Sequence, residues 1–150
     1  VQDKAGDRTQ ALETMQSVLD IDPNDASALN YLGYSWAEMG IKLEQALELI
    51  KKADTLRPDD GYITDSLGWV YYRLGDYDNA VLYLEKAARI TDYETIIADH
   101  LGDAYEKSGQ LEKAIESYQR AIKSAVDEDD KKKIPAIQKK INILKNRLNE

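Results

Sequence analysis

The sequence has no cysteine and a single histidine. Without cysteine the chain forms neither disulfides nor thiolate-bound metal sites. The histidine, His100, has carboxylates nearby at Asp99 and Asp103, but a metal site needs three or four converging ligands, so a surface or groove-lining histidine is favoured. No run approaches the roughly 18 apolar residues of a membrane span, and residues 1–10 lack the hydrophobic region of a signal peptide. We expect no cofactor, no metal and no direct membrane insertion.

Positive charge is also scarce. The 150 residues include 20 lysines and arginines against 28 aspartates and glutamates, a formal net charge of −8. Nucleic acid is not the expected partner, because its backbone requires a basic surface. The acidic run at 127–130 lacks the alternating ligands and central glycine of a calcium loop, and carboxylates at this spacing are typical of a helix start. No nucleophile elbow, phosphate-binding glycine loop or pair of metal-binding histidines occurs, so we expect no enzymatic activity.

What the sequence does contain is a repeated pattern of small and large apolar residues. Gly68 lies 35 residues after Gly33 and 34 residues before Gly102. The extra residue between the first two units falls in a turn between helices, where insertions are easily absorbed. The unit that starts at Gly61 has its recurring residues at Leu67, Gly68, Tyr71, Gly75, Ala80, Leu84 and Ala87, and the next unit at Leu101, Gly102, Tyr105, Gly109, Ala114, Tyr118 and Ala121.

The recurring residues have physical roles in a two-helix unit. The glycines that follow the recurring leucines, such as Gly68, let neighbouring helices approach more closely than a larger side chain allows. The large residue three positions later, such as Tyr71, fills the gap between the two helices. Gly40, Gly75 and Gly109 are expected to end helices in the left-handed conformation. Candidate N-cap residues for the three first helices are Asn24 or Asp25, Asp59 or Asp60, and Thr91 or Asp92.

This pattern predicts helices and no strand. The expected helices span residues 7–20, 26–39, 43–56, 60–74, 77–90, 94–108 and 111–126. The C-terminal segment lacks the glycine and aromatic of the repeat, yet its apolar residues form one helical stripe: Ile134, Ile137, Ile141, Leu144 and Leu148. A terminal helix that covers the last apolar face is favoured, because the stripe is too short for a convincing coiled coil.

These residues and spacings resemble the tetratricopeptide repeat (TPR), whose unit is about 34 residues. The stretches YLGYSWAEMG at 31–40 and GYITDSLGWVYYRLGDYDNAVLYLEKA at 61–87 look most like bacterial multi-repeat TPR proteins, many of them in the cell envelope. The resemblance implies an all-α superhelix of antiparallel helix pairs with a C-terminal capping helix. It divides the chain into half a repeat at 1–25, repeats at 26–60, 61–94 and 95–128, and a cap at 129–150. We expect a piece of a longer array, located on the periplasmic side of the envelope or in the cytoplasm.

The resemblance also implies a concave groove lined by the first helix of each unit. The candidate peptide-binding residues at the family's groove positions are Asn30, Tyr31, Tyr34, Tyr62, Asp65, Ser66, Trp69, Tyr72, Arg73, Asp99, His100 and Asp103. Ser27, Glu38, Ile96 and Glu106 occupy further groove positions. One known TPR subset grips a C-terminal carboxylate with Lys and Asn in the first unit and basic residues in the third. This chain has Asn30 and Tyr34, then Ile96 and Asp99, which argues against such a clamp.

The expected groove is therefore aromatic, with one acidic end. Aromatic side chains supply rigid surface of the kind that dominates interface energetics, although Trp69 and Tyr34 have the alternative of packing between units. The sequence predicts a protein-interaction scaffold whose partner is a protein or peptide with apolar or aromatic anchors and basic residues. The alternative is self-assembly through an uncovered N-terminal helix or through the C-terminal helix.

Overall fold

The computed structural model describes residues 4–150, and within that range the regular structure is entirely helical, which confirms the predicted all-α fold. The helices are α1 (Lys4–Ile21), α2 (Ala26–Met39), α3 (Leu43–Leu56), α4 (Gly61–Arg73), α5 (Tyr77–Ile90), α6 (Thr95–Lys107), α7 (Leu111–Ser124), α8 (Glu128–Lys131) and α9 (Ile134–Leu148).

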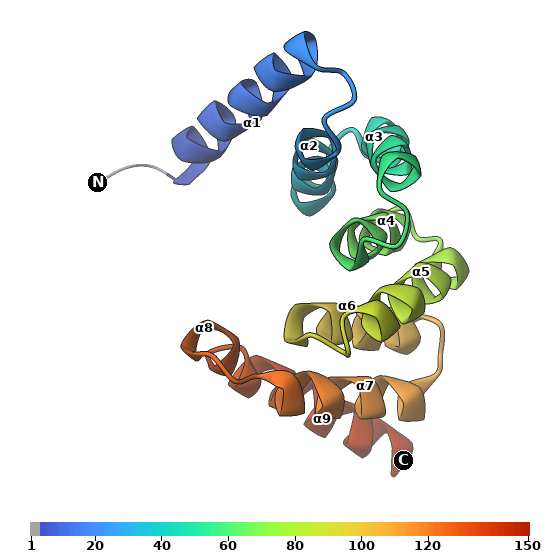
Figure 1. Cartoon of the computed structure of the whole chain (residues 1–150). Coiled ribbons are helices and arrows are strands. Elements are labelled where there is room, and N and C mark those ends of the chain that lie inside the picture. Colours follow the sequence, from blue (N-terminus) through green and yellow to red (C-terminus); the bar gives the residue numbers. More distant parts are fainter. Residues whose placement is uncertain (1–3) are drawn as a thin grey trace.

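The helices form antiparallel pairs that stack into a curved array. The pairs are α2 with α3, α4 with α5, and α6 with α7, and each pair also packs on the next one. The first helices α2, α4 and α6 lie on the inner side of the curve, and α1 and α8 stand on either side of the open space that this side faces (Figure 1). The first helices of adjacent pairs contact one another, α2 with α4 and α4 with α6, so their side chains form one continuous inner surface.

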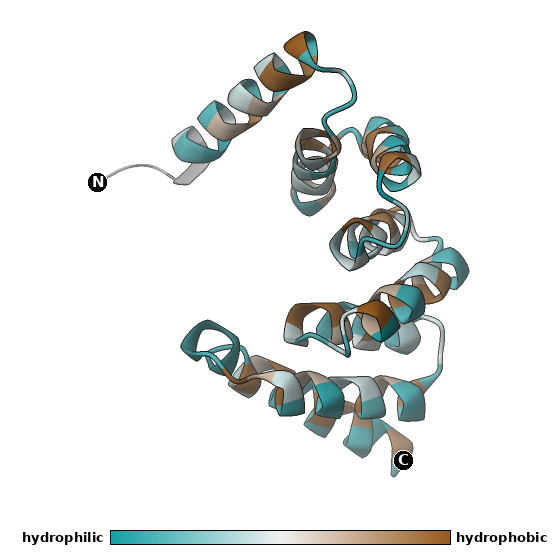
Figure 2. Ribbon diagram, viewed as in Figure 1, coloured by the Kyte–Doolittle hydropathy of each residue, from teal (hydrophilic) through white to brown (hydrophobic). Residues whose placement is uncertain are grey.

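The core runs between the helices along the array. Ala37, Ala46, Ala80 and Ala104 are fully buried, as are many larger side chains around them. At Gly68 an added Cβ would collide with Leu84 of the neighbouring helix, so the close approach expected at this repeat position is present. The longer helices present apolar residues to their neighbours and polar residues to solvent, which gives their mixed colouring in Figure 2.

The helix ends follow the predicted pattern except at one place. Gly40, Gly75 and Gly109 adopt positive φ angles of 69°, 82° and 81° after the first helices. Asp25 and Asp60 are N-caps, as expected. The predicted cap at Thr91 or Asp92 is wrong: α6 begins after Glu94, whose side chain makes no capping bond. The delay has a local cause, since Asp92 and Tyr93 both adopt left-handed backbone, with φ of 53° and 59°.

The C-terminal helix covers the last repeat. In α9, Ile137, Ile141 and Leu144 are 1–3% exposed and belong to the same core cluster as α6 and α7. The acidic run before it starts α8, where the Asp127 carboxylate accepts a bond from the backbone N–H of Asp130. The predicted capping helix is thus confirmed.

Candidate functional site

A hollow of about 420 Å³ lies on the inner surface between α2 and α4. It is lined by Ser27, Asn30, Tyr31, Tyr34, Arg57, Asp60, Tyr62, Ile63, Asp65, Ser66 and Ile96. Six of the predicted groove residues meet here: Asn30, Tyr31, Tyr34, Tyr62, Asp65 and Ser66. Tyr31 is 43% exposed and Tyr62 is 56% exposed, so two aromatic rings stand open to solvent on adjacent first helices.

Asn30 has an unusual feature within this hollow. Its amide oxygen Oδ1 is buried and has no hydrogen-bond partner, the only such side-chain atom among residues 6–150, whose side chains the structure describes. A buried polar atom without a partner costs free energy, because it loses its water without a replacement bond. Because this oxygen is shielded from solvent, a donor from outside the chain would reach it only after the Asn30 side chain rotates.

The floor of the inner surface consists of rings that pack between repeats. The indole of Trp69 stacks on the imidazole of His100, with ring centroids 4.1 Å apart, and on the ring of Tyr72 at 4.6 Å. The indole N–H of Trp69 donates to Oε1 of Glu38 at 2.8 Å, which joins α4 to α2. The expectation of a surface or groove-lining histidine needs correction, because His100 is only 7% exposed. Its Nδ1 lies 2.9 Å from Oδ1 of Asp65.

The predicted acidic end of the groove is occupied by cations from α9. Nζ of Lys140 lies 2.9 Å from Asp99 and 3.0 Å from Asp103, and Arg147 donates to Glu106 at 2.8 Å. These carboxylates are therefore paired within the chain, which reduces the negative charge expected at this end of the groove. Sequence reasoning missed Lys140 because nothing in the helical stripe of α9 identifies what its polar side faces.

Other predicted site residues also have partners within the array. Nε of Arg73 donates to the carbonyl of Ala37 at 3.0 Å, which ties α4 to the end of α2. Burial, followed by the charges of Glu38 and Asp65, raises the pKa of Tyr34 far above its ordinary value. Burial, followed by nearby carboxylates, raises the pKa of Tyr72 to about 12. Both phenols therefore stay neutral at physiological pH and act as hydrogen-bonding or stacking groups.

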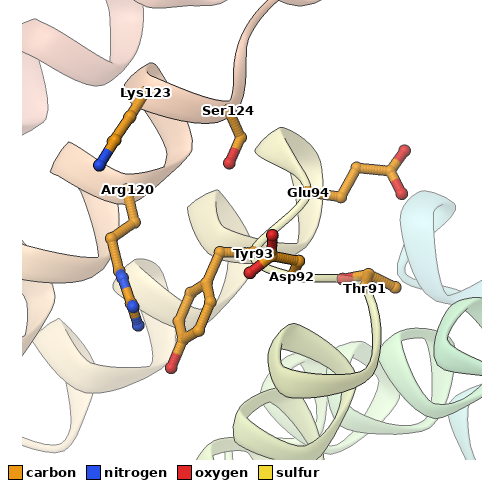
Figure 3. Close-up of a pocket in the computed structure, with 7 residues that line it drawn as sticks. All are labelled: Thr91, Asp92, Tyr93, Glu94, Arg120, Lys123 and Ser124. Atoms are coloured by element: carbon orange, nitrogen blue, oxygen red, sulfur yellow. The ribbon is translucent and has the colours of Figure 1, made fainter.

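A second hollow, of about 490 Å³, lies where the α5–α6 connection meets the end of α7 (Figure 3). Its lining includes Tyr93 and Arg120, whose guanidinium lies over the Tyr93 ring at 3.7 Å from the centroid. In the preceding repeat the corresponding contact is an ion pair of 3.2 Å between Lys86 and Asp59. The two contacts hold the same junction by different chemistry, so the lining of this hollow is explained by repeat packing.

Two features are absent from residues 4–150. No helix there is long and apolar enough to cross a membrane. No group of three or more potential metal-ligating side chains comes together in this part of the chain either.

Comparison with known proteins agrees with the fold. A model described as a tetratricopeptide repeat-like domain matches residues 62–146, more than half of the chain, and a tetratricopeptide repeat model matches residues 1–61. The TPR repeat-containing protein PA4667 of Pseudomonas aeruginosa is 41% identical over 102 residues, which are 67% of this chain and 17% of that protein. Superkiller protein 3 of Schizosaccharomyces pombe is 30% identical over 115 residues, 77% of this chain and 8% of that protein. The chain thus spans less than a fifth of these relatives.

Solved structures share the same architecture. The crystal structure of MamA matches with a TM-score of 0.78 at 22% identity, covering 99% of this chain and 86% of that one. The first TPR of Spaghetti (RPAP3), solved with an HSP90 peptide, matches with a TM-score of 0.72 at 18% identity, covering 86% of this chain and 97% of that one. At these identities the likeness concerns the fold alone. Together with the sequence matches, it leads to one conclusion: the chain belongs to the tetratricopeptide repeat family.

Proposed function

We propose that the hollow between α2 and α4 binds an extended segment of a partner protein. The TPR fold generally mediates protein–protein interaction, and the observation that carries the proposal here is that two exposed aromatic rings, Tyr31 and Tyr62, line one hollow between adjacent first helices. The exposed rings of Tyr31 and Tyr62 offer surface for apolar or aromatic anchors.

The charges around the hollow favour a basic group at one end of the ligand. Asp60 and Asp65 line its wall, and the guanidinium of Arg57 donates to the hydroxyl of Ser27 at 3.2 Å on the rim. The acids at α6 are already paired with α9, so they contribute less to this preference than the sequence predicts. The bound peptide of the RPAP3 structure supports a peptide in such a groove, whereas the carboxylate clamp residues are replaced in this chain.

The test is capture on an array of short synthetic peptides that place aromatic and aliphatic residues at varied spacings. The double variant Tyr31→Ala/Tyr62→Ala should lose capture while its helical circular dichroism stays that of the wild type, because both rings are largely exposed. Leu82→Ala is the matched control, because Leu82 is 58% exposed but lies on α5, outside the hollow. Undiminished capture by the double variant would contradict the proposal.

A second candidate function is self-association through α1. Ala11, Leu12, Met15 and Val18 of this helix are only half-buried, so a second copy has apolar surface to cover there. Sedimentation should then show a concentration-dependent dimer that Val18→Glu abolishes. The stripe of α9 favours this function less, because its central residues are already buried within the array.

A further inference from the structure

The pair formed by Asp65 and His100 is the most buried polar contact between two first helices. Asp65 on α4 is 6% exposed and His100 on α6 is 7% exposed. The 2.9 Å separation of Oδ1 and Nδ1 places the imidazole N–H as donor to the carboxylate. This contact differs from the ion pairs of α9, because only one of its members carries a permanent charge near neutral pH.

The surroundings fix the imidazole and add further negative charge. Trp69 covers one face of the ring by stacking. The charged groups that act on the imidazole are Asp65 from α4 and, on α6 itself, Asp99 and Asp103, both of which contact Lys140 from α9. Among the described residues, α5 and α7 contribute no charge to this group. Burial lowers the pKa of His100, but the attraction and hydrogen bond of Asp65, together with the charges of Asp99 and Asp103, outweigh it, and the net effect raises that pKa.

Asp65 has a second role that connects this pair to the groove. The same residue lines the hollow between α2 and α4, beside Tyr34 and Ser66. Its charge reaches the hydroxyl of Tyr34, where it contributes to the raised pKa after burial and Glu38. The carboxylate therefore lies between the imidazole on one side and the hollow on the other.

We propose that Asp65 selects a cationic side chain of the ligand and that the charge of His100 sets how strongly it does so. This inference rests on the proposed binding of a peptide segment in the hollow. When the imidazole is protonated, its charge offsets that of Asp65. A lysine or arginine in the hollow then gains little attraction to the carboxylate. When the imidazole is neutral, the carboxylate keeps its full charge and attracts the ligand's cation. The proton and the cation thus compete for one carboxylate, and by linkage each weakens the binding of the other.

The competition is measured with matched peptides. Each peptide captured in the peptide-array test is synthesised with its lysine or arginine. It is synthesised again with norleucine in place of lysine or citrulline in place of arginine. The dissociation constant of the cationic peptide should fall by about fivefold or more between about pH 6 and pH 9, the lower range of typical coupling between sites. The neutral counterpart should show no such change. A neutral counterpart with the same pH dependence would overturn the inference.

Variants assign the effect to the two residues. His100→Gln should make the affinity for the cationic peptide independent of pH, and Asp65→Asn should remove the difference between the paired peptides. Asp78→Asn is the control for the change in net charge, because Asp78 is exposed on α5; it should keep the wild-type pattern. Helicity of each variant is checked by circular dichroism before binding is measured.

A direct measurement covers the case in which the variants misfold. His100 is the single histidine, so its imidazole resonance in wild-type protein is unambiguous in an NMR titration. Saturation with a cationic peptide should lower the pKa of His100, and the neutral counterpart should leave it unchanged. If the cationic peptide binds but the pKa of His100 does not change, the inference is overturned while the proposed function stands. If no array peptide binds at either pH, the proposed function fails and this inference fails with it.

Discussion

At the scale of single residues, the repeat array depends on glycines at positions where a neighbouring helix leaves no space for a side chain. Gly102 is the tightest example, because an added Cβ would overlap the aromatic ring of Tyr118. That ring cannot swing away at low cost, since it is 2% exposed and its hydroxyl donates to Asp103 at 2.5 Å. We predict that Gly102→Ala lowers the free energy of unfolding by about 1–3 kcal/mol, the usual cost of overpacking a core. Urea denaturation followed by circular dichroism measures the change.

Gly75→Asn provides the comparison. Gly75 has a φ of 82° but no neighbour within 4 Å of an added Cβ, and asparagine tolerates left-handed backbone better than most residues. The free energy of unfolding should fall less in this variant than in Gly102→Ala. Equal losses would show that backbone conformation, rather than helix approach, explains the repeated spacing of the glycines along the chain.

His100 gives a pH-dependent prediction for stability. Folding raises its pKa above the unfolded value of about 6.5, so its stabilising contribution is fully present below about pH 6.5 and is lost as the pH rises through the folded pKa. The free energy of unfolding should therefore fall between about pH 6 and pH 9. Urea titrations across this range should show the decline in wild-type protein and a flatter profile in His100→Gln. A decline of the same size in the variant would assign it to other groups.

At the scale of helices, α9 contributes charge as well as apolar surface. Lys140 pairs with Asp99 and Asp103 of α6, and its side chain is 37% exposed. We predict that Lys140→Gln lowers the free energy of unfolding by about 1–2 kcal/mol, less than for a fully buried pair because solvent screens the lysine. Lys139→Gln is the control, since Lys139 is an exposed neighbour on the same helix.

A double-variant cycle separates the ion pair from other effects of Lys140. Asp99 and Lys140 are in direct contact, so the losses caused by Asp99→Asn and Lys140→Gln should be non-additive in the double variant. Burial, then the charge of Asp103, raises the pKa of Asp99 despite Lys140, so neutralising this carboxyl removes a repulsion as well as a bond. Strict additivity would mean that the contact contributes nothing to stability.

The sequence predicts the helices well and the contacts between helices poorly. The spans of α2, α3 and α5 agree with the expected residues because periodicity, glycine ends and aspartate caps are local signals. The predicted N-cap of α6 is wrong because Asp92 and Tyr93 adopt left-handed backbone, so the helix begins later in the chain. The burial of His100 and the pairing of Lys140 depend on which polar residues two helices bring together. Groove positions of the family indicate where a side chain lies, but not whether another helix already holds it.

At the scale of the whole molecule, neighbouring helices supply each helix with most of its stability. Helices in the middle of the array pack on both sides: α4 contacts α2, α3, α5 and α6. In contrast, α1 packs mainly on α2, and Leu19 is its one buried residue among those described. Because repeat arrays gain stability chiefly from nearest-neighbour interfaces, local stability should vary along the chain.

We therefore predict a gradient of hydrogen-exchange protection. Amides of α1 should exchange through openings that cost at least about 1 kcal/mol less than those that expose α4 to α6. Leu19→Ala should lower the protection of α1 further and leave that of α6 unchanged, since Leu19 belongs to the core cluster around α2 and α3 and not to the one around α6 and α7. Equal protection of α1 and α6 would instead indicate one cooperative unit. If α1 also became protected as protein concentration rises, its half-buried face would be covered by a second copy, which would support the self-association function.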